Sequence, residues 1–386
     1  MSASTETTQL SKPGMIIDGR EVTAASGATF ETVSPTTNEI IGIVPKAGKD
    51  DAVAAIEAAH RAFESGPWSR FTPLDRSRAL HKVADLLRER IDEISRLETM
   101  NSGKIIVESR GDVTASANCF EYYGNLAGQI WGDQIPMNGP LLDYTLREPY
   151  GVCSQIIPWN FPLLMAAWKV APALAAGNTV VLKPASATPL TALILGQICL
   201  EAGIPAGVMN VLTGSGKELG EVLTTHPLVE KVAFTGETET GREIMRSAAG
   251  TIKKVTLELG GKSPNIVFPD ADLQEAVDGS LFAIFTNAGQ RCTARTRLFL
   301  HKDIYDEFLS TYVDKVSKIR VGDPLDWETQ MGPVISKQQQ KKVLQYCDYA
   351  VEDGAELLHG GKRVAKEEFE KGNFIEPTVF GQVSSD

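Results

Sequence analysis

Residues 151–212 read GVCSQIIPWNFPLLMAAWKVAPALAAGNTVVLKPASATPLTALILGQICLEAGIPAGVMNVL and decide the fold. Three apolar runs in this stretch, VCSQII, NTVVLKP and VMNVL, have the length and composition of buried strands. Helical segments separate them, and the helix expected at 191–202 ends at Gly203, a residue suited to the left-handed end of a helix. Strands that alternate with helices of this length predict a parallel sheet covered on both faces.

The alternation continues beyond residue 212. The runs KVAF and KKVTLEL predict further strands, and a second alternating unit begins near residue 273, with a strand at RLFLH. Towards the N-terminus, Asp50 is placed to cap a first helix, and residues 80–94 carry the apolar stripe of a second. With 386 residues, the chain is long enough for two or more closely joined α/β domains.

Composition narrows the class of partner. The 49 acidic residues outnumber the 38 basic ones, so the net charge of -11 leaves no basic surplus for nucleic-acid phosphates. The most apolar stretch, residues 162–182, is interrupted by charged and helix-breaking residues and falls short of a membrane span. The first ten residues do not resemble a secretory signal, and five scattered cysteines are typical of a cytosolic protein. We therefore expect a cytoplasmic protein with no nucleic-acid, membrane or metal partner.

Two glycine-rich turns follow predicted strands. Gly214, Gly216 and Gly220 lie between VMNVL and a helix, where glycines let a backbone approach a pyrophosphate. Their spacing is one residue longer than the common fingerprint, so a turn that binds no ligand is an equally good interpretation. A second turn at 234–241 again places glycines at a helix start, and the two turns together favour a nucleotide site.

Three further side chains could carry chemistry. Cys292 follows Arg291, whose charge would favour the thiolate, although a lone cysteine is more often a buried structural residue. Glu258 ends an apolar strand, where burial would suit a general base; the alternative is a surface residue or an ion-pair partner. Asn160 lies in a stiff turn between strand and helix, where it could donate to an oxyanion or, more commonly, cap the helix.

Together these pieces resemble the aldehyde dehydrogenase superfamily. They occur in the order and spacing of that family, and the similarity extends from about residue 15 to the last residue. The segments that carry it are IIPWNFP at 156–162, KP at 183–184, FTG at 234–236, LELGGKSP at 257–264 and GQRC at 289–292.

The resemblance implies that an aldehyde is oxidised to its carboxylic acid with NAD or NADP. Cys292 would be the nucleophile that forms a thiohemiacetal and then a thioester, and Glu258 would activate the water that hydrolyses it. Asn160 and the backbone N–H of Cys292 would donate to the oxyanion, and Lys183 resembles the lysine on the adenosine ribose. The other positions expected to contact the cofactor are Ile156, Trp159, Ser186, Gly216, Gly220, Phe234, Gly236, Glu237 and Gly260.

The resemblance also implies a domain plan. A Rossmann-like cofactor domain would comprise residues 1–127 and 150–261, an oligomerisation hairpin residues 128–149, and an incomplete second α/β catalytic domain residues 262–386. Members of the family continue past the segment NFIEPT into Glu-Glu-Ile-Phe-Gly-Pro, whose second glutamate holds the nicotinamide ribose. We therefore expect this sequence to be a fragment of a longer chain, whose full-length form is a homodimer or homotetramer.

Other functions and several details stay open. The chain could be a truncated relative that binds nucleotide or has a structural role without catalysis, or a cysteine hydrolase that uses Cys292 and Glu258. Arg291 could contact a substrate carboxylate, as in some semialdehyde dehydrogenases, but no second arginine is identified to pair with it. Betaine-aldehyde-like and aliphatic aldehydes are equally open.

Two departures from the family pattern bear on the cofactor. Ser186 stands where strongly NAD-selective members often have glutamate, which predicts that both NAD and NADP are used. Glu237 stands where many members have a serine near the pyrophosphate, so its carboxylate is expected to turn away from that group.

Overall fold

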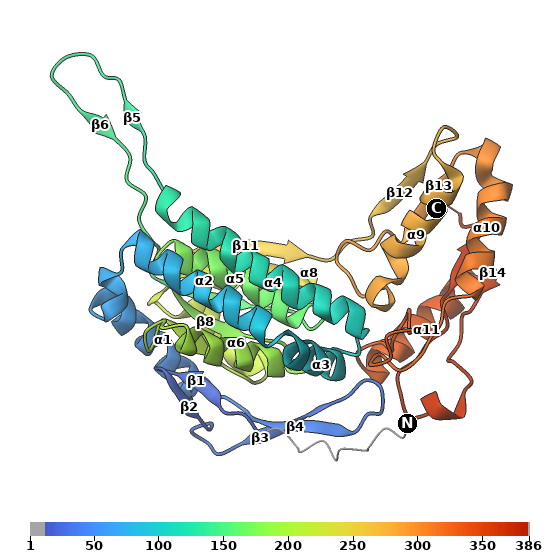
Figure 1. Cartoon of the computed structure of the whole chain (residues 1–386), viewed down its shortest axis with the longest axis horizontal. Helices are drawn as coiled ribbons and strands as arrows, with labels where there is room; N and C mark the ends of the chain where they lie inside the picture. Colours follow the sequence, from blue (N-terminus) through green and yellow to red (C-terminus); the bar gives the residue numbers. More distant parts are fainter. Residues whose placement is uncertain (1–11, 385–386) are drawn as a thin grey trace. The chain divides into compact units, whose positions relative to one another are not determined.

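Seven strands form the main sheet of the structure, a computed structural model that describes residues 12–384. Their order across the sheet is β11-β10-β7-β8-β9-β1-β2, and Figure 1 labels β11, β8, β1 and β2 among them. These strands are β1 (Met15–Ile17), β2 (Arg20–Val22), β7 (Val152–Ile156), β8 (Thr179–Lys183), β9 (Met209–Val211), β10 (Val229–Gly236) and β11 (Lys254–Leu259). β10, β7, β8 and β9 run parallel, whereas β1 is antiparallel to β9 and to β2. The predicted parallel sheet is confirmed, with an antiparallel addition at one side.

Helices cover both faces of this sheet. α5 and α6 pack together and against β7, β8 and β9, while α7 and α8 pack together and against β10. The chain passes from β9 back across β7 to β10, so right-handed crossovers place the two pairs on opposite faces. The helices that precede β11 in the chain are α1 (Lys49–Glu64), α2 (Pro73–Glu89), α3 (Ile91–Ser102), α4 (Ile106–Leu126), α5 (Pro162–Ala175), α6 (Leu190–Glu201), α7 (Gly216–Thr225) and α8 (Thr238–Ala249).

The helix ends show where local sequence was sufficient and where it was not. α6 stops just before Gly203, which has φ +87° as predicted. The predicted cap Asp50 is wrong: Gly48 is the N-cap of α1, and Asp51 accepts the Gly48 N–H at 2.8 Å. The apolar stripe at 80–94 is shared by two helices, because Arg90 leaves the helical conformation between α2 and α3.

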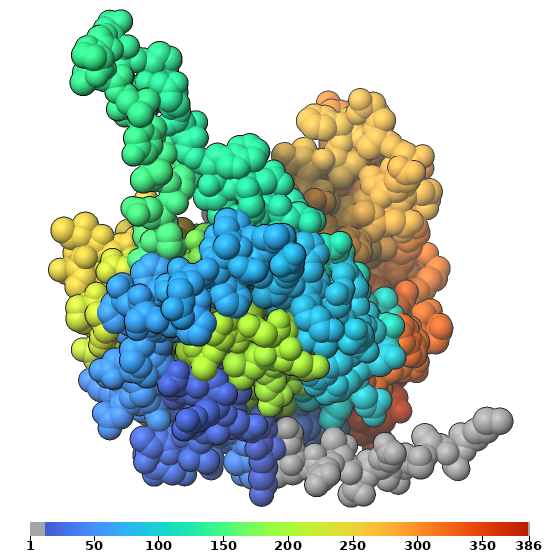
Figure 2. Space-filling model, turned by 60° about the vertical axis from the view of Figure 1, so that its left-hand side comes forward, coloured from blue at the N-terminus to red at the C-terminus, as the bar shows by residue number. Residues whose placement is uncertain are grey.

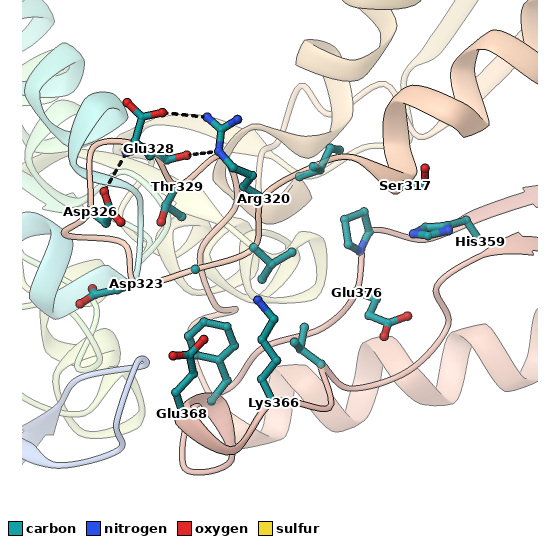
Figure 3. A pocket seen from close by; sticks show the side chains of 16 residues that line it. Ser317, Arg320, Asp323, Asp326, Glu328, Thr329, His359, Lys366, Glu368 and Glu376 are labelled. Atoms are coloured by element: carbon teal, nitrogen blue, oxygen red, sulfur yellow. Dashed lines mark hydrogen bonds and ion pairs between the residues drawn. The ribbon is translucent and has the colours of Figure 1, made fainter.

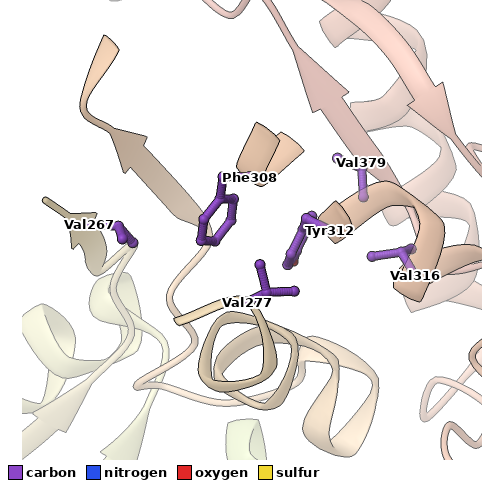
Figure 4. Close-up of a cluster of buried hydrophobic side chains, with 6 residues drawn as sticks. All are labelled: Val267, Val277, Phe308, Tyr312, Val316 and Val379. Carbon is purple, nitrogen blue, oxygen red and sulfur yellow. The ribbon is translucent and has the colours of Figure 1, made fainter. Parts of the chain in front are cut away.

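A second, smaller α/β arrangement begins after β11. β12 (Pro264–Val267) and β13 (Arg297–Leu300) pair in parallel. Further along the chain, β14 (Glu356–His359) and β15 (Val379–Gly381) pair antiparallel. The helices here are α9 (Leu273–Phe285), α10 (Tyr305–Ser317) and α11 (Lys337–Glu352). Figure 4 shows the buried cluster formed by Val267, Val277, Phe308, Tyr312, Val316 and Val379, which joins β12, α9, α10 and β15 in one core.

A β-hairpin lies between α4 and β7. Its strands, β5 (Gln134–Ile135) and β6 (Asp143–Tyr144), are antiparallel, and the green segment that protrudes in Figure 2 contains them. Large apolar side chains on this segment are open to solvent, with Trp131 71%, Leu142 74% and Leu146 72% exposed. A monomeric protein rarely exposes so many apolar side chains together.

The described residues divide into two compact units. The first holds the residues up to Thr32 together with Gly42–Ile94 and Gly111–Glu258, and includes the main sheet and the hairpin. The second holds Val33–Ile41, Ser95–Arg110 and the chain from Leu259 onward.

This division departs from the predicted domain bounds because two N-terminal segments pack with the second unit. The N–H of Asn373 donates to the Pro35 carbonyl at 3.0 Å, and that of Ile106 donates to the Pro324 carbonyl at 2.7 Å. The assignment of cofactor binding and catalysis to separate domains stays a prediction.

Candidate active site

In the first unit, three predicted cofactor residues lie side by side at the carboxyl ends of parallel strands. Ile156 of β7 is in register with Lys183 of β8 on one side and with Phe234 of β10 on the other. The direction of strand order reverses between β7 and β10, and ligands of open α/β sheets bind outside the carboxyl ends at such a point.

The Lys183 side chain is almost completely buried. Its side chain is only 4% exposed, and its ammonium group donates to the Pro184 carbonyl at 3.0 Å. Burial lowers the pKa of Lys183 to about 8. A buried ammonium with a single carbonyl partner retains donors for a ligand hydroxyl or phosphate.

A hydrogen bond joins the turn after β8 to the turn after β9. The Ser186 hydroxyl donates to the Gly214 carbonyl at 2.8 Å. Gly214 has φ +151°, which favours glycine, and α7 begins two residues later at Gly216. A Cβ added at Gly216 or Gly220 would meet no atom within 4 Å apart from the backbone of the helix itself, so the first turns of α7 are open at these positions. An open helix N-terminus with free space above it fits the pyrophosphate of a dinucleotide.

The Phe234 ring packs against Gly236 in the turn after β10. A Cβ at Gly236 would lie 2.5 Å from the Phe234 ring, so only glycine fits there without moving that ring. Glu237 is the N-cap of α8, but its side chain makes no capping bond and is exposed. The Glu237 carboxylate is therefore free to turn away from a pyrophosphate, as the sequence predicts.

Asn160 and Trp159 lie in the connection from β7 to α5. The N-cap of α5 is Phe161, whose side chain makes no capping bond, and Pro162 follows at the first helical position. Asn160 therefore precedes the cap position by one residue, and both it and Trp159 are partly exposed. This position disfavours the interpretation of Asn160 as the helix cap. Its predicted role as an oxyanion donor stays a prediction.

Glu258 lies on β11, the last strand at its side of the described sheet, and is exposed. The burial expected at this strand end is wrong, because alternate residues of an edge strand face outward. A partly buried neighbour was not predicted: burial lowers the pKa of Lys169 to about 8, and the charge of Glu258 opposes that shift. The Lys169 carbonyl also accepts the Gln155 side-chain amide at 2.7 Å.

In the second unit, Cys292 follows a turn with three consecutive left-handed residues. Asn287 and Ala288 have φ +51°, and Gly289 has φ +75°. Left-handed conformations of residues other than glycine cost on the order of 1–3 kcal/mol each and persist only where surrounding contacts impose them. Such strain clusters at functional sites.

Two side chains impose this turn. The Glu108 carboxylate accepts the Asn287 N–H at 3.0 and 3.1 Å. Gln290 accepts the Ile335 N–H at 2.9 Å and donates to the Asn287 carbonyl at 3.1 Å. A Cβ at Gly261 would lie 3.8 Å from the Cys292 carbonyl, so the turn containing Gly260 also lies near Cys292.

Among the five cysteines, all in the described range, only Cys292 is exposed. Burial raises the pKa of Cys153 and of Cys199 to about 12 and that of Cys119 to about 11. Burial also raises the pKa of the Cys347 thiol. Because the thiolate is the nucleophilic form, these four thiols are poor candidates and Cys292 is the accessible one.

A larger hollow than the one beside Cys292 lies elsewhere in the second unit. It has a volume of about 680 Å³ and contains none of the predicted site residues. Figure 3 shows acidic and basic side chains around it, including the ion pair of Arg320 with Glu328. In the described part of the chain, no group of three or more His, Cys, Asp or Glu side chains could hold a metal ion. Within residues 12–384, no helix has the length and apolar character that crossing a membrane requires.

Comparison with known proteins resolves the family. The sequence model described as the aldehyde dehydrogenase family matches residues 22–386. The chain belongs to the aldehyde dehydrogenase family. The predicted resemblance and the predicted α/β fold are both confirmed.

Relatives of this aldehyde dehydrogenase cover nearly all of it. An aldehyde dehydrogenase of Aspergillus niger is 46% identical over 374 residues, 97% of this chain and 74% of that protein. A betaine aldehyde dehydrogenase of Bacillus subtilis is 44% identical over 375 residues, 96% of this chain and 76% of that protein. The NAD+ complex of an aldehyde dehydrogenase from Bacillus cereus has a TM-score of 0.95 and 43% identity, over 97% of this chain and 76% of that one.

Family membership settles the general activity. The chain is an NAD(P)-dependent oxidoreductase that acts on aldehydes, with a cofactor of the NAD type. The open helix N-terminus at Gly216 and the buried Lys183 fit such a dinucleotide. The sequence did not reveal that Glu108 and Gln290 bond to the turn before Cys292, or that Lys169 lies near Glu258. Of these three residues, only Gln290 lies within a recognisable motif.

Proposed function

We propose that Cys292 is the nucleophile in the oxidation of an aldehyde to its carboxylic acid. The observation that carries this proposal is the exposure of Cys292, which follows a strained turn, while the other four thiols are buried or partly buried. The sulfur adds to the aldehyde carbonyl and forms a thiohemiacetal, and loss of a hydride leaves a thioester on the same sulfur. When bound, the nicotinamide supplies the hydride acceptor.

Asn160 stabilises the negative charge on the former carbonyl oxygen. Its amide donates to the oxyanion, and the backbone N–H of Cys292 is the second donor. Its position in the turn after β7, one residue before the cap of α5, supports this role. Donors aimed at a developing oxyanion commonly supply much of the rate enhancement in acyl-transfer catalysis.

Glu258 completes the reaction as general base. Its carboxylate takes a proton from water as the water oxygen attacks the thioester carbon. The carbon–sulfur bond breaks, the acid leaves, and the Cys292 thiolate is restored. The exposure of Glu258 supports this role, because a general base for hydrolysis needs access to water.

The turns after β8, β9 and β10 hold the cofactor in this proposal. Lys183 and Ser186 would contact the adenosine ribose or its 2′-phosphate, and the N-terminus of α7 would face the pyrophosphate. Ser186 carries no charge that repels a 2′-phosphate, so both NAD and NADP are used. The remaining predicted contacts are Ile156, Trp159, Gly216, Gly220, Phe234, Gly236, Glu237 and Gly260.

The hairpin of β5 and β6 supports a homo-oligomer. Exposed Trp131, Leu142 and Leu146 would lose contact with water if a second copy covered them. We expect the protein to be a homodimer or homotetramer, which analytical ultracentrifugation of the wild type and of Leu142→Asp would test.

Replacement of the nucleophile tests the function directly. Purified Cys292→Ala should reduce no NAD with propanal and should hydrolyse no nitrophenyl ester, while its affinity for NAD stays near that of the wild type. Cys347→Ser is the matched control and should retain turnover. Reduction of NAD by the Cys292→Ala variant would overturn the proposal. A wild type that hydrolyses esters without oxidising aldehydes would indicate a hydrolase, and one that only binds NAD would indicate a non-catalytic relative.

A further inference from the structure

A small hollow adjoins the proposed nucleophile within the second unit. It has a volume of about 230 Å³ and is lined by Ser263, Phe282, Ala283, Arg291, Thr293 and Arg295. Arg291 and Thr293 are the two chain neighbours of Cys292. Consecutive Cα atoms are about 3.8 Å apart, so a group bound here is only a short reach from the sulfur. The hollow is thus placed to recognise a part of the substrate near the reacting carbon.

Two arginines line this hollow. The second arginine that the sequence did not reveal is Arg295, which the fold brings to the same lining as Arg291. The backbone N–H of Arg295 donates to the Ala283 carbonyl at 3.2 Å, which anchors this residue to the end of α9. The Arg291 guanidinium lies 5.7 Å from the centre of the Phe282 ring, a cation–π contact.

Neither guanidinium has a carboxylate of its own. Among residues 12–384, no acidic side chain forms an ion pair with Arg291 or Arg295, and no acidic residue lines the hollow. Other arginines of the chain differ: Arg320 pairs with Glu328 at 3.3 Å, and Arg90 pairs with Glu93 at 2.9 Å. Two like charges in one hollow repel each other unless an anion lies between them.

The rest of the lining suits an anion on a short apolar chain. Ser263 and Thr293 contribute hydroxyl groups that can donate to anionic oxygens. Phe282 and Ala283 provide an apolar wall for the methylene groups that would join such an anion to the aldehyde. Arginine forks match the planar oxygens of carboxylates and the oxygens of phosphates.

We propose that Arg291 and Arg295 bind the terminal anionic group of an aldehyde substrate, so that the preferred substrates are short aldehydes with a carboxylate or a phosphate at the far end. This proposal rests on the proposed function, because it takes Cys292 as the atom that attacks the aldehyde. The anion takes no part in the bond changes; it orients the carbonyl carbon towards the sulfur. A quaternary ammonium aldehyde is disfavoured by the same two charges.

Four aldehydes of similar size test the charge preference. These are 4-oxobutanoate, its neutral methyl ester, glycolaldehyde phosphate and trimethylammonioacetaldehyde, each assayed for NAD reduction by the wild type. We expect kcat/KM for an anionic aldehyde to exceed that for the methyl ester about ten- to a hundredfold, the range of a charge-assisted hydrogen bond. The first and third aldehydes distinguish a carboxylate from a phosphate. Equal kcat/KM for all four would overturn the inference and leave the proposed function intact, whereas oxidation of none would count against the proposed function.

Variants locate the preference. Arg291→Gln and Arg295→Gln should each lower the anionic-to-neutral ratio of kcat/KM about tenfold, mainly through KM. Arg320→Gln, which removes a guanidinium that already has a carboxylate, should leave this ratio unchanged. Arg295→Glu should raise kcat/KM for the trimethylammonium aldehyde above that of the wild type, a gain that misfolding cannot produce. If Arg295→Glu folds, oxidises the methyl ester and shows no such gain, the two arginines do not select the substrate.

Discussion

Both carboxylate oxygens of Glu108 accept the backbone N–H of Asn287, at 3.1 and 3.0 Å, five residues before Cys292. Removing this acceptor leaves a donor in a left-handed turn with one partner fewer, at a cost of about 1–3 kcal/mol. We predict that Glu108→Ala lowers kcat about tenfold or more while KM changes little, because the sulfur is less well placed. The rate at which iodoacetamide alkylates Cys292 should also differ between this variant and the wild type.

Glu275→Ala is the control for this prediction, since Glu275 is exposed and belongs to α9. It should match the wild type in both measurements. If Glu108→Ala loses thermal stability but keeps the wild-type kcat and alkylation rate, Glu108 has a structural role and does not position the nucleophile.

Glu258→Gln should slow hydrolysis of the thioester more than its formation, because an amide does not accept the proton from water. A burst of NAD reduction followed by slow turnover is expected, and mass spectrometry of quenched samples should show acyl-enzyme. Glu230→Gln, on the neighbouring strand β10, is the control and should show no burst. Unchanged steady-state turnover in Glu258→Gln would show that another group activates the water.

Asn160→Ala should cost roughly 2.7–4 kcal/mol of transition-state stabilisation, as measured through kcat/KM, because one oxyanion donor is lost. Circular dichroism and the unfolding temperature should change little, since Phe161 and not Asn160 occupies the cap position of α5. The opposite pattern, a loss of stability with kcat/KM retained, would return Asn160 to the role of a helix cap.

Ser186→Glu should shift coenzyme preference towards NAD, because a carboxylate would repel the 2′-phosphate of NADP. The KM for NADP should rise about tenfold or more, with a smaller change for NAD. Ser186→Ala is the control: it removes the hydrogen bond to Gly214 without adding charge, so it separates the loss of that bond from repulsion. Equal increases in KM for both coenzymes would show that the loop, and not the charge, was altered.

Local patterns were sufficient for much of the fold. The strands at 152–156, 179–183 and 209–211 are buried runs bounded by turn residues, so their positions and the parallel sheet followed from the sequence. The cap of α1 was misplaced, because Asp50 and Asp51 are adjacent and only the folded geometry shows which of them bonds to Gly48.

Contacts between distant segments could not be predicted. Glu108 and Asn287 are 179 positions apart, and no local pattern marks that glutamate as an anchor for the turn before Cys292. Arg291 and Arg295 are close in sequence, but their common hollow exists only after the turn and α9 are folded. The individual site residues came from the resemblance to the family rather than from spacing, because each alone had a commoner structural explanation.

Because the five thiols differ in exposure, labelling of Cys292 can measure the fraction of active molecules in a sample. A maleimide added briefly to the native protein should label one sulfur per chain, and the labelled fraction equals the fraction with an open Cys292. Dividing the measured rate of a preparation by that fraction gives the turnover number per active molecule, without a contribution from inactive protein. Storage without reductant would destroy the same sulfur first, so loss of label would report ageing of a sample before any change in its fold.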